Sequence, residues 1–193
     1  NTRLMTLQNG AGHEDLLKEF VDEDHIVIGT TEDNGAVLGM GHVRRGGTGV
    51  TNVGMLVEDK EGFLPQLKEA FDQCGFNVKI HENIQTLIWD KLFTNVSLSA
   101  LTGVLQVDMG YIAANEYAWD LCCQLIHETV KTAAAAGLNF DEEKVREKVK
   151  NTSINNPNGC TSIRADLRDG RRTEVDTISG AVVRAAHKYG VEV

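Results

Sequence analysis

The sequence predicts an α/β region followed by an all-α domain, and a change of pattern near residue 82 is the main observation behind this prediction. Up to about residue 80 the chain is rich in glycine and in short β-type runs that alternate with two helical patterns, which favours an α/β sheet. Beyond that point the β-type runs stop and long segments carry helical periodicity. The 193 residues, 24% charged and 41% hydrophobic, exclude disordered, collagen-like and disulfide-framework proteins.

The α/β region is expected to contain both strands and helices. Its strands correspond to the β-type runs at residues 3–8, 25–31, 36–43, 49–57 and 77–81. Its helices are expected at residues 13–20 and at 61–74, where apolar residues recur at helical spacing and Gly75 ends the run.

The second region is expected to be entirely helical, with segments at residues 84–105, 111–136, 141–151 and 173–189. Asp141 is expected to cap the third segment, and Thr173, directly before Glu174, the fourth. Residue 1 lies almost directly on an apolar strand and residue 193 ends an apolar Val-Glu-Val, so we expect the chain to be a fragment.

The charge balance excludes several classes of partner. Lys and Arg number 19 against 28 Asp and Glu, which gives a formal charge of −9 and argues against a nucleic-acid partner. The longest apolar stretches are far shorter than the ~20 residues of a spanning helix, and the first residues lack the apolar core of a signal peptide. We therefore expect a soluble cytoplasmic protein without a membrane partner.

The four cysteines give no sign of a disulfide framework or a metal site. They are Cys74, Cys122, Cys123 and Cys160, without a C-x-x-C pair, and we interpret them as reduced thiols that fill space. His127 lies one helical turn after Cys123, but no second pair with ligand spacing accompanies it. No bound metal is expected.

The segment 84–105 is apolar nearly all round and should be largely buried, yet it carries polar residues at regular spacing. Lys91, Asn95 and Ser99 occur at i, i+4 and i+8, which places them on one stripe of an α-helix. Burial lowers the pKa of a lysine toward neutrality, so Lys91 is the best candidate for a general acid. The alternative is a lysine that reaches the surface, with Asn95 and Ser99 as hydrogen bonders between helices.

Three further sequence features could serve a site or merely shape the backbone. The run at 8–12, with Asn9 before two glycines, could admit a ligand close to the backbone or form a simple turn. Ser162 and Glu174 could contact a ligand or stabilise helix starts. The glycine-rich run at 46–49 lacks a Walker lysine and is expected to form a hairpin or bulge, and no G-x-G-x-x-G is present.

Four segments together resemble the ketopantoate reductase (2-dehydropantoate 2-reductase) family, in the right order along nearly the whole chain. They are LQNGAG at 7–12, the glycine-rich stretch at 29–54, WDKLFTNVSLSALTGVL at 89–105, and Ser162 followed by TEVD at 173–176. The resemblance implies that residues 1–82 are the C-terminal portion of an NADP-binding Rossmann domain and that residues 83–193 form a helical substrate and catalytic domain. It also implies that the nucleotide fingerprint lies upstream of this chain.

The resemblance also implies roles for individual residues. Lys91 becomes the general acid that protonates the ketone oxygen while NADPH delivers hydride to the carbonyl carbon. Glu174 becomes the residue that holds the hydroxyl end of the substrate, and Asn9 lies near the nicotinamide and the substrate.

Three further residues are implied to bind substrate. Asn95 supplies an amide and Ser162 contacts the substrate carboxylate. Ser99 stands where the family usually has a second asparagine. A shorter side chain at that position leaves a gap or a water in a substrate contact, which leaves the identity of the 2-oxo acid open.

The expected function is therefore NADPH-dependent reduction of 2-dehydropantoate to pantoate, a step of pantothenate biosynthesis, with the fragment expected to be inactive alone. The alternatives are a related reductase of another 2-oxo acid and a non-catalytic helical oligomerisation module. The oligomeric state, including a homodimer, and the choice between NADP and NAD stay open.

Overall fold

The computed structural model describes residues 2–193 and divides the chain into two compact units. The first, here called the sheet unit, contains the chain up to Gln8 together with His13–Ile88. The second, the helical unit, contains Trp89–Val193 together with the short segment Asn9–Gly12. The expected order of an α/β region before an all-α region is confirmed, but Asn9–Gly12 packs with the helices.

The sheet unit is built on four strands in the order β1-β2-β5-β6. These are β1 (Leu4–Thr6), β2 (Ile26–Thr31), β5 (Val50–Met55) and β6 (Asn77–Ile80). The β1–β2 and β5–β6 pairs are parallel and the central β2–β5 pair is antiparallel. Four of the five expected strands are thus confirmed, in slightly shorter form.

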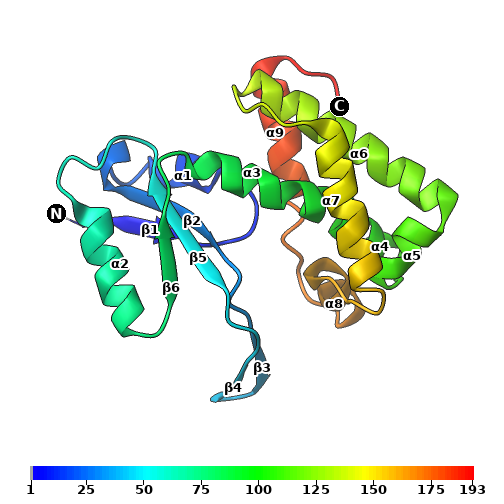
Figure 1. Ribbon diagram of the computed structural model, residues 1–193, viewed down its shortest axis with the longest axis horizontal. Coiled ribbons are helices and arrows are strands. Elements are labelled where there is room, and N and C mark those ends of the chain that lie inside the picture. The colour runs from blue at the N-terminus through cyan, green and yellow to red at the C-terminus, as the bar shows by residue number, and fades with distance from the viewer. Residues whose placement is uncertain (1) are drawn as a thin grey trace. The chain divides into compact units, whose positions relative to one another are not determined.

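Helix α2 (Phe63–Gln73) confirms the helix expected at 61–74, and it lies along the sheet in Figure 1. The buried cluster between them consists of Val27, Val53, Met55, Leu64 and Val78. The other helical elements of this unit are the short α1 (His13–Leu17) and the 3-10 turn η1 (Glu23–His25).

The single strand expected at 36–43 is wrong, because this stretch folds into a hairpin of β3 (Gly35–Gly39) and β4 (His42–Arg45). Gly41 has φ +70° and turns the chain back, a conformation that favours glycine. The expected hairpin or bulge at 46–49 is instead the exit from this hairpin. There the N–H groups of Gly46 and Gly47 donate to the backbone and side-chain oxygens of Asn34, at 2.8 and 3.0 Å.

The segment expected to be helical at 84–105 forms one long helical run, but the run is not a uniform α-helix. It consists of α3 (Ile84–Thr94), a π-helical turn η2 (Asn95–Ser99) and α4 (Ala100–Leu105). Leu92, Phe93 and Leu98 are fully buried, which confirms the expected burial for the middle of the run, whereas Val104 and Leu105 at its end are exposed. The ring of Phe93 meets Phe140 edge-on, with centroids 4.8 Å apart.

The later helices differ from the expected boundaries. The segment at 111–136 is two helices, α5 (Met109–Ala114) and α6 (Glu116–Ala135), because the Asn115 side chain accepts from the Ala118 N–H and starts a new helix. Asp141 caps α7 (Glu142–Asn155), as expected. A separate α8 (Ser162–Arg168) precedes α9 (Ser179–Tyr189), which begins six residues after Thr173.

The four cysteines agree in part with their interpretation as thiols that fill space. All four cysteines are free. Cys122 is buried whereas Cys74 and Cys160 are exposed, so the interpretation as a thiol that fills space applies to Cys122 and not to Cys74 or Cys160. Burial raises the pKa of the Cys122 thiol to about 11. Among residues 2–193, no group of three or more potential metal ligands is clustered, and no helix is long and apolar enough to cross a membrane.

Candidate active site

Asn9 and Glu174, two of the predicted site residues, are in direct contact. The Asn9 amide Nδ2 donates to the Glu174 carboxylate Oε2 at 3.1 Å, and both side chains are partly buried. The two residues are 165 positions apart, yet both belong to the helical unit. The structure thus brings a fixed amide donor and an anionic acceptor into one place.

Glu174 lies in a turn and not in the first turn of a helix, so the expected helix start at Thr173 is wrong. The N–H groups of Thr177 and Ile178 donate to the Glu174 carbonyl oxygen at 3.1 and 3.0 Å. The turn ends at Ile178, whose ψ of −87° is outside the α-helical range, and α9 starts at the next residue. The Thr173 hydroxyl accepts from the Val175 N–H, at 3.4 Å.

Lys91, Asn95 and Ser99 follow one another along the buried helical run. Lys91 is in the last turn of α3 and is partly buried, Asn95 opens the π turn, and Ser99 closes it with 5% exposure. A π turn bonds each residue to the fifth along, so the 3.6-residue period behind the predicted common stripe does not hold through Asn95–Ser99. Such π turns occur frequently at functional sites.

Two buried hydroxyls, on Ser97 and Thr102, satisfy carbonyl oxygens around this π turn. Ser97 donates to the Phe93 carbonyl at 2.6 Å, and Thr102 Oγ1 lies 3.0 Å from the Leu98 carbonyl and 3.1 Å from that of Ser99. Sequence reasoning missed Ser97 and Thr102 as site supports. In the sequence, both stand out solely as polar residues within an otherwise apolar helical segment.

Ser162 is the first residue of α8 and is exposed, so it does not cap that helix. Thr161 is the cap, because its Oγ1 accepts from the Arg164 N–H at 3.3 Å. The same oxygen lies 2.8 Å from Thr102 Oγ1, in a buried contact that joins the start of α8 to the helix after the π turn. Ser99 and Ser162 are therefore carried on two segments tied together through Thr102 and Thr161.

The loop between α8 and Glu174 is held by ion pairs. Arg171 binds Asp166 at 2.9 Å and Asp169 at 2.7 Å, and Arg168 binds Asp169 at 2.8 Å. Hydrogen bonds from Arg168 and then Arg171 lower the pKa of the Asp169 carboxyl to about 2. The loop therefore has a defined path into the turn that presents Glu174.

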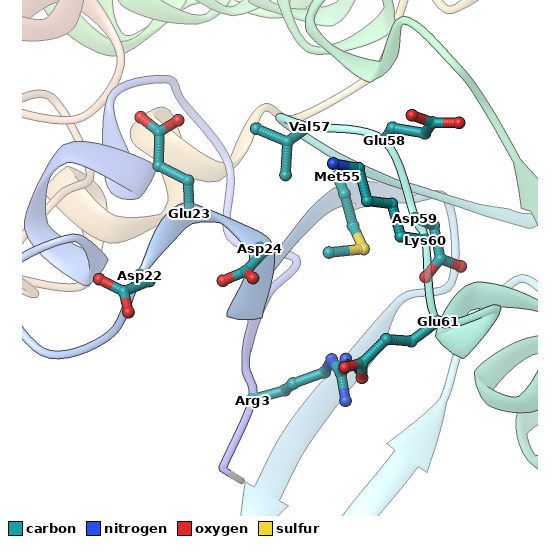
Figure 2. Close-up of a pocket in the computed structure, with 10 residues that line it drawn as sticks. All are labelled: Arg3, Asp22, Glu23, Asp24, Met55, Val57, Glu58, Asp59, Lys60 and Glu61. Carbon is teal, nitrogen blue, oxygen red and sulfur yellow. Dashed lines mark hydrogen bonds and ion pairs between the residues drawn. The ribbon is translucent and has the colours of Figure 1, made fainter.

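The sheet unit contains a hollow of about 660 Å³ that holds none of the predicted site residues. Figure 2 shows carboxylate side chains around it and the Arg3 side chain directed at Glu61, to which it is bound at 2.5 Å. It is lined by Arg3, Asp22, Glu23, Asp24, Met55, Val57, Glu58, Asp59, Lys60 and Glu61. The lining has six carboxylate side chains and two cationic ones, so this hollow is unsuited to binding an anionic ligand such as a carboxylic acid.

Comparison with known families identifies the same family that the sequence motifs resemble. Residues 83–193 match the family described as "Ketopantoate reductase PanE/ApbA C terminal", and residues 1–58 match "Ketopantoate reductase PanE/ApbA". The chain belongs to the ketopantoate reductase family. The two matches lie along the sheet and helical regions in the order expected.

Relatives within and around the ketopantoate reductase family match along the whole chain. The 2-dehydropantoate 2-reductases of Halobacterium salinarum and Streptococcus pyogenes are 30% and 28% identical, each over 98% of this chain and 62% of the relative. A solved D-mandelate dehydrogenase, in complex with NADH and anilino(oxo)acetate, is 28% identical with a TM-score of 0.88, over 99% of this chain and 63% of that one. The chain thus spans just under two thirds of these proteins.

The likeness to solved structures confirms the predicted fold class of this ketopantoate reductase family member. It is an α/β region of Rossmann type followed by an all-α domain.

Proposed function

We propose that the protein is an oxidoreductase that reduces 2-dehydropantoate to pantoate with NADPH, as a step of pantothenate biosynthesis. Family membership supports the reaction class. The observation that carries the proposal for this chain is the Asn9–Glu174 hydrogen bond, because it forms a polar pair from two of the family-like motifs. The proposal places the enzyme in the cytoplasm, and a mass measurement in solution decides whether it is a homodimer.

Lys91 is proposed as the general acid. Addition of hydride to a ketone places negative charge on the oxygen, and a nearby ammonium group both stabilises that charge and supplies the proton. The helix around Lys91 supports this role, since Leu92 and Phe93 beside it are fully buried and hold the backbone in place. Lys91 is itself partly buried, so the proposed role requires only that its ammonium group reach the part of the site open to a ligand.

Glu174 is proposed to bind the hydroxyl end of the substrate. An ionised carboxylate has two oxygens and about four acceptor positions, so one oxygen can accept from Asn9 while the other accepts from a substrate hydroxyl. Asn95 and Ser99 are proposed as further polar contacts, and Ser162, exposed at the start of α8, as the contact to the substrate carboxylate.

The nicotinamide cofactor would supply hydride to the carbonyl carbon. The segment after β1 is suited to a flat ring close to the backbone, because Gly12 has φ +81° and open space where a Cβ would stand. Asn9, three residues earlier, would contribute its amide beside the ring and the substrate.

A second candidate is the reduction of another 2-oxo acid with NADH. Ser99 favours it, because a serine in place of the family's usual asparagine would leave more room for the substrate. The similarity to a D-mandelate dehydrogenase solved with NADH also favours it. A larger acid would then fill the space that the shorter side chain leaves.

A panel of 2-oxo acids assayed with NADPH and NADH on the whole protein tests the proposal. We expect the highest kcat/KM for 2-dehydropantoate with NADPH. We also expect Glu174→Ala to lower kcat/KM about 10- to 100-fold through the loss of a charged hydrogen bond, whereas Glu147→Ala on the exposed face of α7 changes it little. A preference for an aromatic 2-oxo acid with NADH would support the second candidate, and no oxidation of either cofactor would refute both.

A further inference from the structure

Gly10 makes an unusually close backbone contact inside the helical unit. It has φ +99°, and a Cβ at this position would lie 2.0 Å from the Thr177 carbonyl oxygen and 2.5 Å from its carbonyl carbon. Real Cβ atoms essentially never come within 3.0 Å of a non-bonded heavy atom outside their own and the adjacent residues. Only glycine therefore allows the segment Asn9–Gly12 to lie this close to the turn after Glu174.

The contact with Thr177 also includes a hydrogen bond. The Ala11 N–H donates to the same Thr177 carbonyl oxygen at 3.0 Å. That oxygen is directed at a residue 166 positions earlier in the sequence, and Ala11 is itself buried with 8% exposure. The segment is thus held to the turn by both a steric fit and a buried hydrogen bond.

Thr177 in turn fixes Glu174. Its N–H and its hydroxyl Oγ1 both donate to the Glu174 carbonyl oxygen at 3.1 Å. The contacts close a ring: Ala11 is bound to Thr177, Thr177 to Glu174, and the Glu174 carboxylate to the amide of Asn9. Two side chains from opposite ends of the chain are placed by one backbone turn.

We propose that Gly10 and Thr177 are positioning residues that set Asn9 against Glu174 before any ligand binds. The inference rests on the proposed function and deepens it, because it assigns the alignment of the acid–amide pair to this backbone contact. A pair that is already aligned loses less conformational freedom when substrate binds, which strengthens binding of the 2-oxo acid. Neither positioning residue touches the reacting atoms.

Amide hydrogen exchange in the unliganded whole protein tests the contact without any assay of activity. Gly10→Ala is expected to raise the exchange rate of the Ala11 N–H about tenfold or more, because the added methyl forces the segment away from Thr177. Gly137→Ala is the matched control, since Gly137 also has a positive φ, +85°, but open space around it. The interior amides of α6 report whether each variant is folded. Unchanged protection of Ala11 in Gly10→Ala, or equal loss in both variants, would overturn the proposal.

Steady-state kinetics then test whether the contact positions the site. Gly10→Ala and Thr177→Val are expected to raise KM for the 2-oxo acid about tenfold, with a smaller change in kcat. Thr177→Ser, which keeps the hydroxyl donor to Glu174, should restore KM, and Gly137→Ala should leave it unchanged. Altered exchange with unaltered KM would show that the contact does not position the site. A protein that reduces no 2-oxo acid would refute the proposed function, while the exchange experiment would still decide on the contact.

Discussion

Replacement of Thr102 by valine removes a buried hydroxyl that joins the helix after the π turn to the cap of α8. Thr102 is 0% and Thr161 9% exposed, and their Oγ1 atoms are 2.8 Å apart. The Thr161 oxygen accepts from the Arg164 N–H, and the Thr102 hydroxyl can donate to the Leu98 carbonyl. If the Thr161 hydroxyl donates to the Thr102 oxygen, both hydroxyl groups have a donor and an acceptor partner. Valine has nearly the same shape as threonine and a similar helix propensity but lacks the hydroxyl, which isolates the hydrogen bonds.

The expected loss of stability follows from these bonds. Losing the net contribution of one hydrogen bond costs about 1 kcal/mol, and leaving the Thr161 hydroxyl without an acceptor costs about 1–2 kcal/mol more. The total of about 2–3 kcal/mol corresponds to a fall in Tm of roughly 5–10 °C for a chain of this size.

Urea unfolding of Thr102→Val, compared with Thr152→Val, measures this effect. The Thr152 hydroxyl donates to the Lys148 carbonyl in an exposed part of α7, so that control should change the free energy of unfolding by less than about 0.5 kcal/mol. A double variant with Thr161→Val should show coupling of about 1 kcal/mol. Equal effects of Thr102→Val and Thr152→Val would refute the assignment of the buried pair.

Two further predictions concern titrating groups. Burial raises the pKa of Cys122 to about 11, so this residue should stay a protonated thiol at neutral pH. It should therefore react with an alkylating reagent much more slowly than the exposed Cys160, as measured by peptide mass analysis. Equal rates would contradict its burial. Arg168 and Arg171 lower the pKa of Asp169 to about 2. The Asp169 carboxylate should therefore stabilise the loop fully above pH ~4 and lose that contribution as the pH falls toward 2. A titration of this carboxyl by NMR with a midpoint near 4 would contradict the ion pairs.

The parts of the fold set by local periodicity could be predicted from the sequence. The strands around residues 26–31 and 50–55 and the buried run at 84–105 have strong apolar patterns that tertiary contacts reinforce. The π turn could not be predicted, because one wider turn barely disturbs the apolar pattern around it. The break at Asn115 was missed because apolar residues continue at helical spacing on both sides of this cap.

The candidate site was predicted by residue type but not by geometry. The sequence predicts both Asn9 and Glu174 as site residues, yet their pairing depends on Gly10 fitting against Thr177, a contact that no local pattern encodes. Glu174 was expected to start a helix because threonine followed by a carboxylate is typical of helix starts. In the folded chain the contact with Asn9–Gly12 and the backbone angle at Ile178 end that turn early.

The kcat of Lys91→Ala in the whole protein, measured with the best 2-oxo acid and saturating cofactor, tests the central claim most directly. A positioned general acid contributes about 10²- to 10⁴-fold, so kcat should fall by that factor, while Lys144→Ala on the exposed face of α7 stays close to the unsubstituted protein. Turnover of Lys91→Ala within about threefold of the unsubstituted protein would contradict the role of Lys91 as proton donor.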